Sequence, residues 1–265
     1  MREHEIRAAR DAADDHVRHG GRTTEGGRMS WHKEPLVGFD LETTGTDVET
    51  DRVVTAAVIR LDAAGRAAPA LSWILDPGVP IPPEASAIHG FSTDYVRQYG
   101  RPAAAGLTEI TEALAAALGE GTPLVVMNAR YDLSLLDREC RRHGVVPLSE
   151  RLGTDPAPVV DPLVLDKHLD PYRKGKRTLQ ALCAHYGVVL DAAHEAGADA
   201  VAAVGVARRI GAKHPEVAGL TRPALHALQR QAAADQAASF QRYLRRTADP
   251  TAHVEPAWPL IPKER

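Results

Sequence analysis

Three short apolar runs, which follow a polar stretch at the start of the chain, constrain its fold more than any other feature. They occupy residues 36–40, 53–61 and 71–75, and short connections with turn-forming residues separate them. The second run is rich in β-branched residues, and closely spaced runs of this length are typical of consecutive antiparallel strands. The sequence therefore predicts that the folded part of the chain opens with an antiparallel meander.

The hydrophobic periodicity then changes to the spacing of helices. Apolar side chains recur on one helical face over residues 103–118, at Leu107, Ile110, Leu114 and Leu118. Further predicted elements are a buried strand at 124–127, a helix ending near Gly144, a strand at 159–161, and helices at 163–168, 178–186 and 199–210. A meander followed by alternating strands and helices predicts an α/β fold, with a mixed β-sheet flanked by α-helices.

The two ends of the chain differ from this central part. Residues 1–33 are rich in Arg, His, Asp and Gly, and we interpret them as a flexible polar N-terminal extension. Both Met1 and Met29 are compatible with the start of the protein, and we take Met29 as a hypothesis. Residues 34–212 form the predicted central domain, and residues 213–265 an added C-terminal helix with a Pro-rich tail.

Composition excludes several classes of protein. The chain carries 32 Lys and Arg against 35 Asp and Glu, a net charge of −3, and 44% hydrophobic residues, as in ordinary soluble globular proteins. It contains no apolar stretch long enough to span a membrane and no signal-peptide core near the start, so we predict no membrane partner and a cytoplasmic location. Cys140 and Cys183 are interpreted as reduced core thiols.

The first predicted strand runs into two acidic residues at its C-terminal end. Asp40 and Glu42 are two residues apart, so their carboxylates point to the same face at the strand end. Two like charges at this distance repel unless a cation compensates them, and oxygen ligands suit Mg²⁺ or Mn²⁺. The sequence predicts a metal site here, and a solvated strand end with two unrelated acids is the alternative.

Two further segments place acids near predicted helix starts. Asn-Ala-Arg-Tyr-Asp, ending at Asp132, follows the buried strand at 124–127. His-Glu-Ala-Gly-Ala-Asp runs from His194 to Asp199. Taken singly, each aspartate is also compatible with a helix cap, and the histidine with a surface residue. The basic loop at 173–177 has two interpretations, a phosphate contact or a solvated helix lead-in.

In this order and position, the three acidic segments resemble the motifs of the DEDDh family of 3′→5′ exonucleases. The family includes the proofreading subunit of bacterial DNA polymerase III, and its fold is RNase H-like. The first motif matches Asp-Leu-Glu-Thr-Thr-Gly at residues 40–45, and the second matches with Tyr131 in place of Phe. The family's Ile-His-Gly segment matches residues 88–90, whereas Met127 stands where many members carry His. The resemblance covers about residues 36–210.

The resemblance implies a catalytic site that holds two Mg²⁺ ions, for which Mn²⁺ substitutes. The implied metal ligands are Asp40, Glu42, Asp132 and Asp199. His194 is the implied general base, a role for which a histidine with its ordinary pKa of about 6.5 is suited at neutral pH. The implied contacts to the terminal nucleotide are Leu41, Thr43, Thr44, Glu84, His89 and Asn128.

The function that this resemblance implies is removal of nucleoside 5′-monophosphates from a free 3′ end, with DNA favoured over RNA. The implied partner is therefore nucleic acid. The apolar face of the C-terminal helix also suggests a docking site for a DNA polymerase, for a second copy of the chain or for the domain itself. An exonuclease-fold subunit with little activity and an RNA-trimming enzyme remain alternatives. Aromatic residues make up 5% of the chain, which argues against a long stacking platform for single strands.

Overall fold

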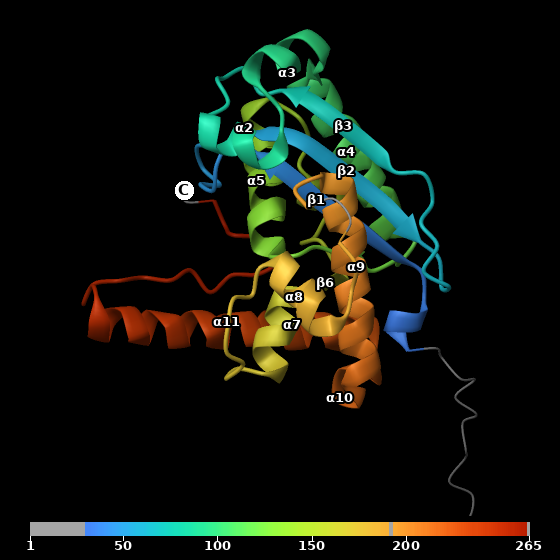
Figure 1. Ribbon diagram of the computed structural model, residues 1–265, viewed down its shortest axis with the longest axis vertical. Helices are drawn as coiled ribbons and strands as arrows, with labels where there is room; N and C mark the ends of the chain where they lie inside the picture. Colours follow the sequence, from blue (N-terminus) through green and yellow to red (C-terminus); the bar gives the residue numbers. More distant parts are fainter. Residues whose placement is uncertain (1–29, 191–192, 264–265) are drawn as a thin grey trace, which may run out of the picture.

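A mixed β-sheet forms the centre of the computed structural model, which describes residues 30–190 and 193–263 (Figure 1). Its strands within the described residues are β1 (Leu36–Thr43), β2 (Val53–Leu61), β3 (Leu71–Asp76), β4 (Arg101–Pro102), β5 (Leu124–Val125) and β6 (Val159–Val160). The strand order is β4-β3-β2-β1-β5-β6. β2 pairs antiparallel with β1 and β3, whereas β5 is parallel to β1 and β6. This pairing confirms the predicted meander and the mixed sheet.

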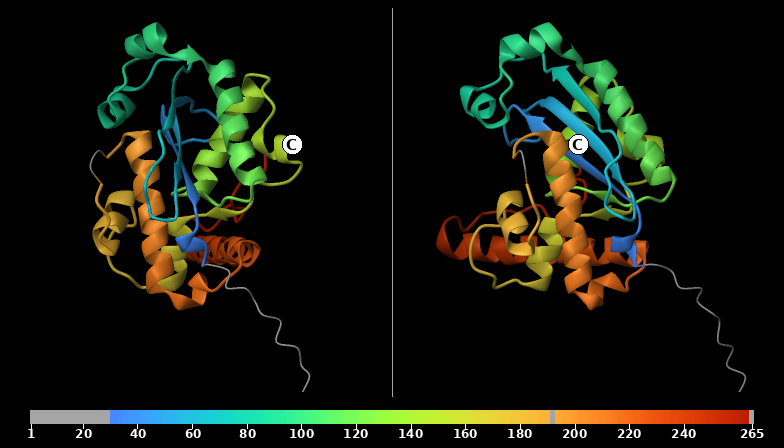
Figure 2. Two further views of the ribbon diagram at one scale, coloured as in Figure 1. Left: turned by 90° about the vertical axis from the view of Figure 1, so that its right-hand side faces the viewer. Right: turned by 45° about the vertical axis from the view of Figure 1, so that its right-hand side comes forward.

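Helices cover both faces of the sheet. They are α2 (Pro83–His89), α3 (Thr93–Tyr99), α4 (Ala103–Gly119), α5 (Ala129–Arg142), α6 (Leu148–Leu152), α7 (Pro162–Leu169), α8 (Leu179–Tyr186), α9 (Ala196–Lys213), α10 (Pro215–Ala218) and α11 (Arg222–Thr247), with the 3₁₀ helix η1 (Trp31–Lys33). Figure 2 shows α4 and α5 on one face and α8 and α9 on the other. In the described part of the chain, no helix combines the length and apolar character that a membrane span requires.

Helix α9 lies unusually close to the central strand β1. A Cβ atom on Gly38 would lie 2.6 Å from the backbone oxygen of Ala200, a distance that no ordinary side chain tolerates. Glycine at this position therefore allows backbone-to-backbone approach between the strand and the helix. The close approach matters for the site, because Asp40 lies two residues beyond Gly38 and Asp199 directly precedes Ala200.

Helix α11 covers the edge of the sheet beside β6. The backbone N–H of Asp161 donates to Oε1 of Gln229 at 2.7 Å, and Nε2 of Gln229 donates to the oxygen of Val159 at 3.0 Å. The backbone N–H of Val159 donates to Nδ1 of His226 at 3.1 Å. Side chains of α11 thus bond the backbone groups that another strand would otherwise bond. We considered three docking sites for this helix: a polymerase, a second copy of the chain and the domain itself. The first half of the helix packs on the domain itself.

Both ends of the described chain also pack on the domain. Trp31 is buried and its Nε1 donates to the oxygen of Val217 at 2.9 Å, so packed structure begins within the range 1–33 that we interpreted as a flexible extension. Residues 1–29, including Met29, lie outside the described residues. The tail after α11 returns toward α5, where the N–H of Ile261 donates to the Ser134 hydroxyl at 2.8 Å (Figure 1).

Candidate active site

The C-terminal end of β1 and the first turn of α5 bring the first three acidic residues together. Asp40 and Glu42 lie on β1 and are partly exposed, and Asp132 is buried in α5. The backbone N–H of Leu41, between the two β1 acids, donates to Oδ1 of Asp132 at 3.2 Å. A direct hydrogen bond therefore fixes the α5 carboxylate against the strand that carries the other two.

A sharp turn between β5 and α5 aims Asp132 at β1. Asn128 adopts a left-handed conformation with φ 63°, which is uncommon for a residue other than glycine. The N–H groups of Asn128 and Ala129 donate to the two carboxylate oxygens of Asp161, at 3.1 and 2.9 Å. Nε1 of Trp258, in the C-terminal tail, donates to the same carboxylate at 3.2 Å. The buried Asp161 side chain thus holds the turn that precedes Asp132.

The fourth acid and the histidine come from the start of α9. Asp199 lies in the first turn of this helix, which begins at Ala196 rather than at Asp199 as predicted. The backbone N–H of His194, whose φ is 69°, donates to Oδ2 of Asp199 at 3.2 Å. Glu42, His194 and Asp199 each offer one ligand atom, and these atoms lie within 4.8 Å of one another. Segments more than 150 residues apart in the chain therefore converge on one site.

Burial and mutual repulsion disfavour the charged forms of these acids. Burial raises the pKa of the Asp40 carboxyl well above its ordinary value, and the charges of Asp132 and Asp199 raise it further, as does that of Glu42. Burial and the charge of Asp199 raise the pKa of Glu42 to about 7. Burial also raises the pKa of Asp132 and of Asp199. Without a compensating cation the cluster is electrostatically unfavourable at neutral pH.

The donor set fits hard divalent cations. Oδ1 of Asp199 is buried and lacks a hydrogen-bond partner among the described residues, which leaves one carboxylate oxygen free for a ligand. Several carboxylates and one imidazole at a strand end offer the oxygen-rich coordination that Mg²⁺ and Mn²⁺ prefer. A cation there would both satisfy the free oxygen and relieve the repulsion that raises the carboxyl pKa values.

The threonines after Glu42 differ in how much of their hydrogen-bonding capacity is used. The Thr43 hydroxyl donates to the oxygen of Gly45 at 2.7 Å and lies 2.8 Å from the Tyr131 hydroxyl, which also bonds to Gly45. Thr44 is buried, and its hydroxyl donates to Asp51 at 2.8 Å. Tyr131 stands where the family motif has Phe, and its hydroxyl group joins α5 to the end of β1. The sequence identified this substitution without indicating the contact.

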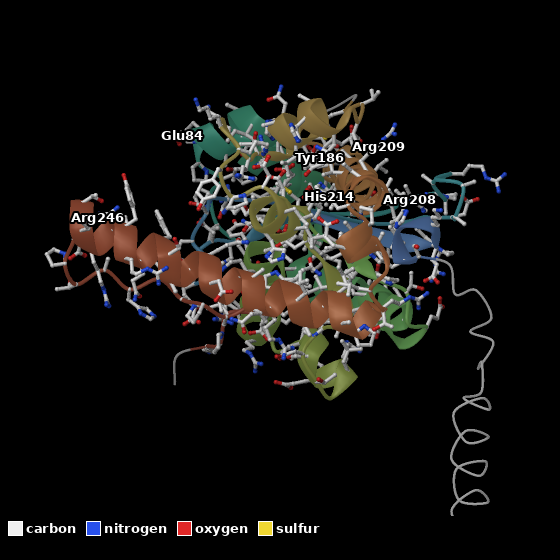
Figure 3. The ribbon with its side chains drawn as sticks, turned by 90° about the horizontal axis from the view of Figure 1, so that it is seen from below. Glu84, Tyr186, Arg208, Arg209, His214 and Arg246 are labelled. Atoms are coloured by element: carbon white, nitrogen blue, oxygen red, sulfur yellow. The ribbon has the colours of Figure 1, made fainter. Side chains whose placement is uncertain are left out.

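Helix α2 brings one of the other predicted substrate contacts to the end of β1. His89 is buried at the end of α2; burial lowers its pKa, and its proximity to the Thr43 backbone opposes that shift. Glu84 is exposed at the start of the same helix (Figure 3). Leu41 is buried, and Asn128 is half-buried in the turn before α5. His89 therefore lies beside the acidic site, and Glu84 lies on the surface of the helix that carries it.

The basic loop at 173–177 has a structural role in addition to its charge. Arg173 donates to Oδ2 of the buried Asp166 at 2.9 Å, and Arg177 pairs with the same oxygen. Lys174 and Lys176 are exposed. Two guanidinium groups thus share one buried carboxylate, which leaves a net positive charge on this side of the molecule.

An RNase H-like sheet with four carboxylates and a histidine clustered at the end of its central strand and at two adjacent helix starts is the architecture of a nuclease domain. The sequence matches the exonuclease family RNase T over residues 37–207. The chain belongs to this family, and the match confirms the resemblance drawn from the three motifs.

Curated relatives are consistent with this assignment. Over 166 residues the chain is 30% identical to the DNA polymerase III subunit epsilon of Treponema pallidum. This match covers 62% of this chain and 71% of that subunit. It is 28% identical, also over 166 residues, to the PolC-type DNA polymerase III of Lacticaseibacillus paracasei. That match covers 63% of this chain but only 10% of the polymerase. The exonuclease-family part of the chain is thus similar in sequence to parts of two DNA polymerase III proteins.

Solved exonuclease I structures share the fold. The enzyme from Methylocaldum szegediense is 26% identical with a TM-score of 0.57, and E. coli exonuclease I in complex with a dA16 oligonucleotide is 21% identical with a TM-score of 0.59. Each match covers 69% of this chain and 42% of the other. The chain thus spans less than half of the length of those proteins.

Proposed function

We propose that this protein is a divalent-metal-dependent 3′→5′ exonuclease that removes nucleoside 5′-monophosphates from the 3′ end of DNA. The observation that carries the proposal is the convergence of Asp40, Glu42, Asp132 and Asp199 with His194. Membership of the exonuclease family supports the reaction class. The E. coli exonuclease I complex with dA16 and the epsilon relative support DNA as the substrate.

The four carboxylates would hold two Mg²⁺ ions, for which Mn²⁺ would substitute. Such ions activate a water and stabilise the negative charge on the attacking and departing oxygens of a phosphodiester. The carboxylates of Asp40 and Glu42 come from one rigid strand, and Asp132 is fixed to that strand by a hydrogen bond. This rigidity favours a preorganised site, in which little reordering is needed when ligands bind.

His194 is the proposed general base. Its backbone N–H donates to Asp199, and one imidazole nitrogen lies within 4.8 Å of carboxylate oxygens of Glu42 and Asp199. The side chain itself is exposed, so it can face an attacking water at the edge of the acidic cluster. The imidazole nitrogen would accept the proton that this water loses as it attacks the phosphorus atom.

The terminal nucleotide would lie against the end of β1 and helix α2. His89 and the Thr43 backbone are adjacent there, and Glu84 is available on the exposed face of α2. These groups would orient the 3′ end without selecting a base sequence. Leu41, Thr44 and Asn128 remain proposed contacts through their backbone or side chains.

The deciding experiment is digestion of matched 5′-labelled DNA and RNA strands, with free or blocked 3′ hydroxyls, in Mg²⁺, Mn²⁺ or EDTA. We expect stepwise shortening of DNA from a free 3′ end with metal and none with EDTA. Faster digestion of RNA would favour the RNA-trimming alternative. Cleavage that persists in EDTA, or the absence of cleavage of every strand, would contradict the proposal.

Matched variants separate catalysis from folding. Asp40→Asn should abolish metal-dependent cleavage, yet it should leave the melting temperature in EDTA at pH 8 equal or higher, because it removes one repelling charge. His194→Ala should slow cleavage by about 10²–10⁴-fold. Glu112→Gln, an exposed carboxylate on α4, is the control and should cleave at the wild-type rate. Wild-type turnover by Asp40→Asn would refute the site assignment.

A further inference from the structure

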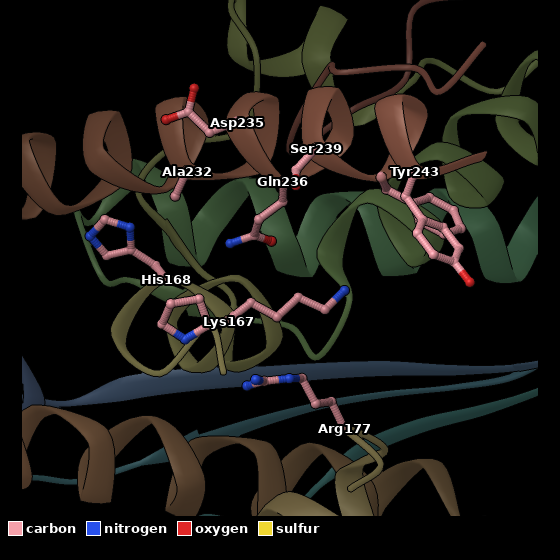
Figure 4. Close-up of a pocket in the computed structure, with 10 residues that line it drawn as sticks. Lys167, His168, Arg177, Ala232, Asp235, Gln236, Ser239 and Tyr243 are labelled. Carbon is pink, nitrogen blue, oxygen red and sulfur yellow. The ribbon is translucent and has the colours of Figure 1, made fainter. Parts of the chain in front are cut away.

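A groove lies between α11 and the segment formed by α7 and the loop after it, outside the acidic cluster. Its volume is about 550 Å³, and its lining includes Lys167, Arg177, Gln236, Phe240 and Tyr243. Figure 4 shows the side chains of Lys167 and Arg177 on the side of the groove opposite α11, and the Tyr243 ring hanging from α11. The α11 residues lie beyond residue 207, where the family match ends.

Two aromatic rings project from α11 at this groove. Phe240 and Tyr243 are each 52% exposed, although large aromatic side chains like these are usually buried to a greater extent. Their ring centroids are 6.4 Å apart and their planes differ by only 13°, so the rings are nearly parallel. Exposed, parallel aromatic faces beside cations are typical of the platforms on which single-stranded nucleic acids stack their bases.

The opposite wall of the groove supplies positive charge. Arg177 is held by the buried Asp166, which it shares with Arg173, so the pair of arginines keeps a net positive charge. Lys167 is half-buried and has no ion-pair partner among the described residues. Asp235, the acid in the lining, accepts from Gln231 at 3.0 Å and points away from Lys167 (Figure 4). An anion entering the groove would therefore meet a net positive charge on this wall.

The groove continues toward the acidic cluster. A smaller cavity of about 140 Å³ shares Lys167, Gln236 and Phe240 with it and extends to Asn128 and Arg130. Asn128 and Arg130 lie in the turn and first helical residues that immediately precede Asp132. A strand whose 3′ end lies at the carboxylates can therefore pass Arg130 and Lys167 before it reaches the two rings.

We propose that this groove binds the single-stranded segment upstream of the scissile phosphate, with bases stacked on Phe240 and Tyr243 and phosphates beside Lys167 and Arg177. The inference rests on the proposed exonuclease function, because it extends the path of the same strand. Single-stranded nucleic acid fits better than a protein partner, since the lining combines cations with open ring faces and leads directly to the acidic site. The two rings form a short platform, in keeping with the scarcity of aromatic residues in the chain.

Binding is tested without cleavage in the Asp40→Asn background, in EDTA, by fluorescence anisotropy of a labelled twelve-nucleotide oligothymidylate. Replacing both rings with leucine keeps apolar side chains but removes the stacking faces, and it should weaken binding roughly tenfold or more. The ring-preserving pair Phe240→Tyr and Tyr243→Phe should bind like the parent. Lys167→Gln should weaken binding and lower its salt dependence. Arg209→Gln, an exposed cation on α9 away from α11 (Figure 3), controls for lost charge.

Leucine variants that bind the oligonucleotide like the parent would overturn the proposal. A change from dimer to monomer by light scattering in the leucine variants, with DNA binding retained, would instead identify the rings as a contact between two copies. Half-exposed rings should be replaceable without unfolding, and the melting temperature checks this. If leucine substitution does unfold the chain, unchanged binding and salt dependence in Lys167→Gln overturn the proposal alone.

A second measurement separates this inference from the proposed function. In the otherwise wild-type protein with Mg²⁺, the ratio of kcat/KM for the oligonucleotide to that for a mononucleotide p-nitrophenyl ester should fall roughly tenfold in the leucine variants. An unchanged ratio with normal cleavage would refute the proposed role of the groove in strand binding and would leave the proposed exonuclease activity standing. If neither substrate is hydrolysed but oligonucleotide binding still depends on the groove residues, the proposed exonuclease activity is refuted and the proposed binding surface stands.

Discussion

Replacing Gly38 with alanine is expected to separate the strand and the helix that carry the acidic cluster. The added Cβ would lie 2.6 Å from the oxygen of Ala200, whereas ordinary van der Waals contact begins at 3.4 Å. The oxygen of Ala200 belongs to the backbone and cannot rotate away, so α9 has to move from β1 by about 0.8 Å. Overpacking of this kind costs about 1–3 kcal/mol, and in a domain of this size lowers Tm by about 2–12 °C.

The same displacement should impair catalysis, because Asp199 directly precedes Ala200 and faces the carboxylates of β1. Functional groups need to be held to within about 0.5 Å, and a misplacement near 1 Å can cost up to about 10²-fold in rate. We therefore expect Gly38→Ala to need more Mg²⁺ for half-maximal activity and to have a lower kcat.

The assay combines thermal unfolding with a Mg²⁺ titration of cleavage. Gly119→Ala is the matched control, since a Cβ at this helix end meets no atom within 4 Å and should leave both Tm and activity close to the wild-type values. A Gly38→Ala protein that melts within about 1 °C of the wild type and keeps its Mg²⁺ requirement would refute the close-approach argument.

Three further outcomes are expected. Because the pKa of Glu42 is raised from 4.5 to about 7, the folded state retains a proton that the unfolded chain releases, so metal-free stability should fall as pH rises through this range. Tm in EDTA from pH 4.5 to 8 checks this, and Mg²⁺ should reverse the trend; a flat or rising profile without metal would count against it. Gln229→Leu should cost on the order of 2–4 kcal/mol in urea unfolding, because two buried backbone groups at the β6 edge lose their partners. Tyr131→Phe should cost about 1 kcal/mol in unfolding and less than tenfold in cleavage rate, since it removes the hydroxyl beside Thr43 but leaves the carboxylates; a loss as large as that of Asp40→Asn would contradict this.

Long periodic elements were the most predictable part of the fold. The three opening runs became β1, β2 and β3, and the apolar faces around Leu114 and Cys140 became α4 and α5. The short helices α2 and α3 and the two-residue strand β4 were not predicted. Elements this short contain less than two or three turns of periodic pattern, so their formation depends on the packing around them.

Some charged residues were likewise recognised from the sequence, whereas the roles of others became clear only in the structure. Asp40, Glu42, Asp132, His194 and Asp199 were recognised because they occur in compact motifs. Asp161, which holds the turn before α5, was noted only as the last residue of a strand. Its partners on α11 and on the tail are 68 and 97 residues away along the chain, respectively. The basic loop likewise gave no sign that Arg173 and Arg177 share Asp166.

By itself, the sequence determined the class of fold and the family, and it supplied the proposed active-site side chains, because alternating polarity and short motifs are local properties of the chain. Only the tertiary structure decided how those side chains are held: the contact of Gly38 with α9, the turn fixed by Asp161, and the aromatic groove under α11. Each of these depends on the distance between segments remote in sequence, and such distances arise from the packing of the whole domain.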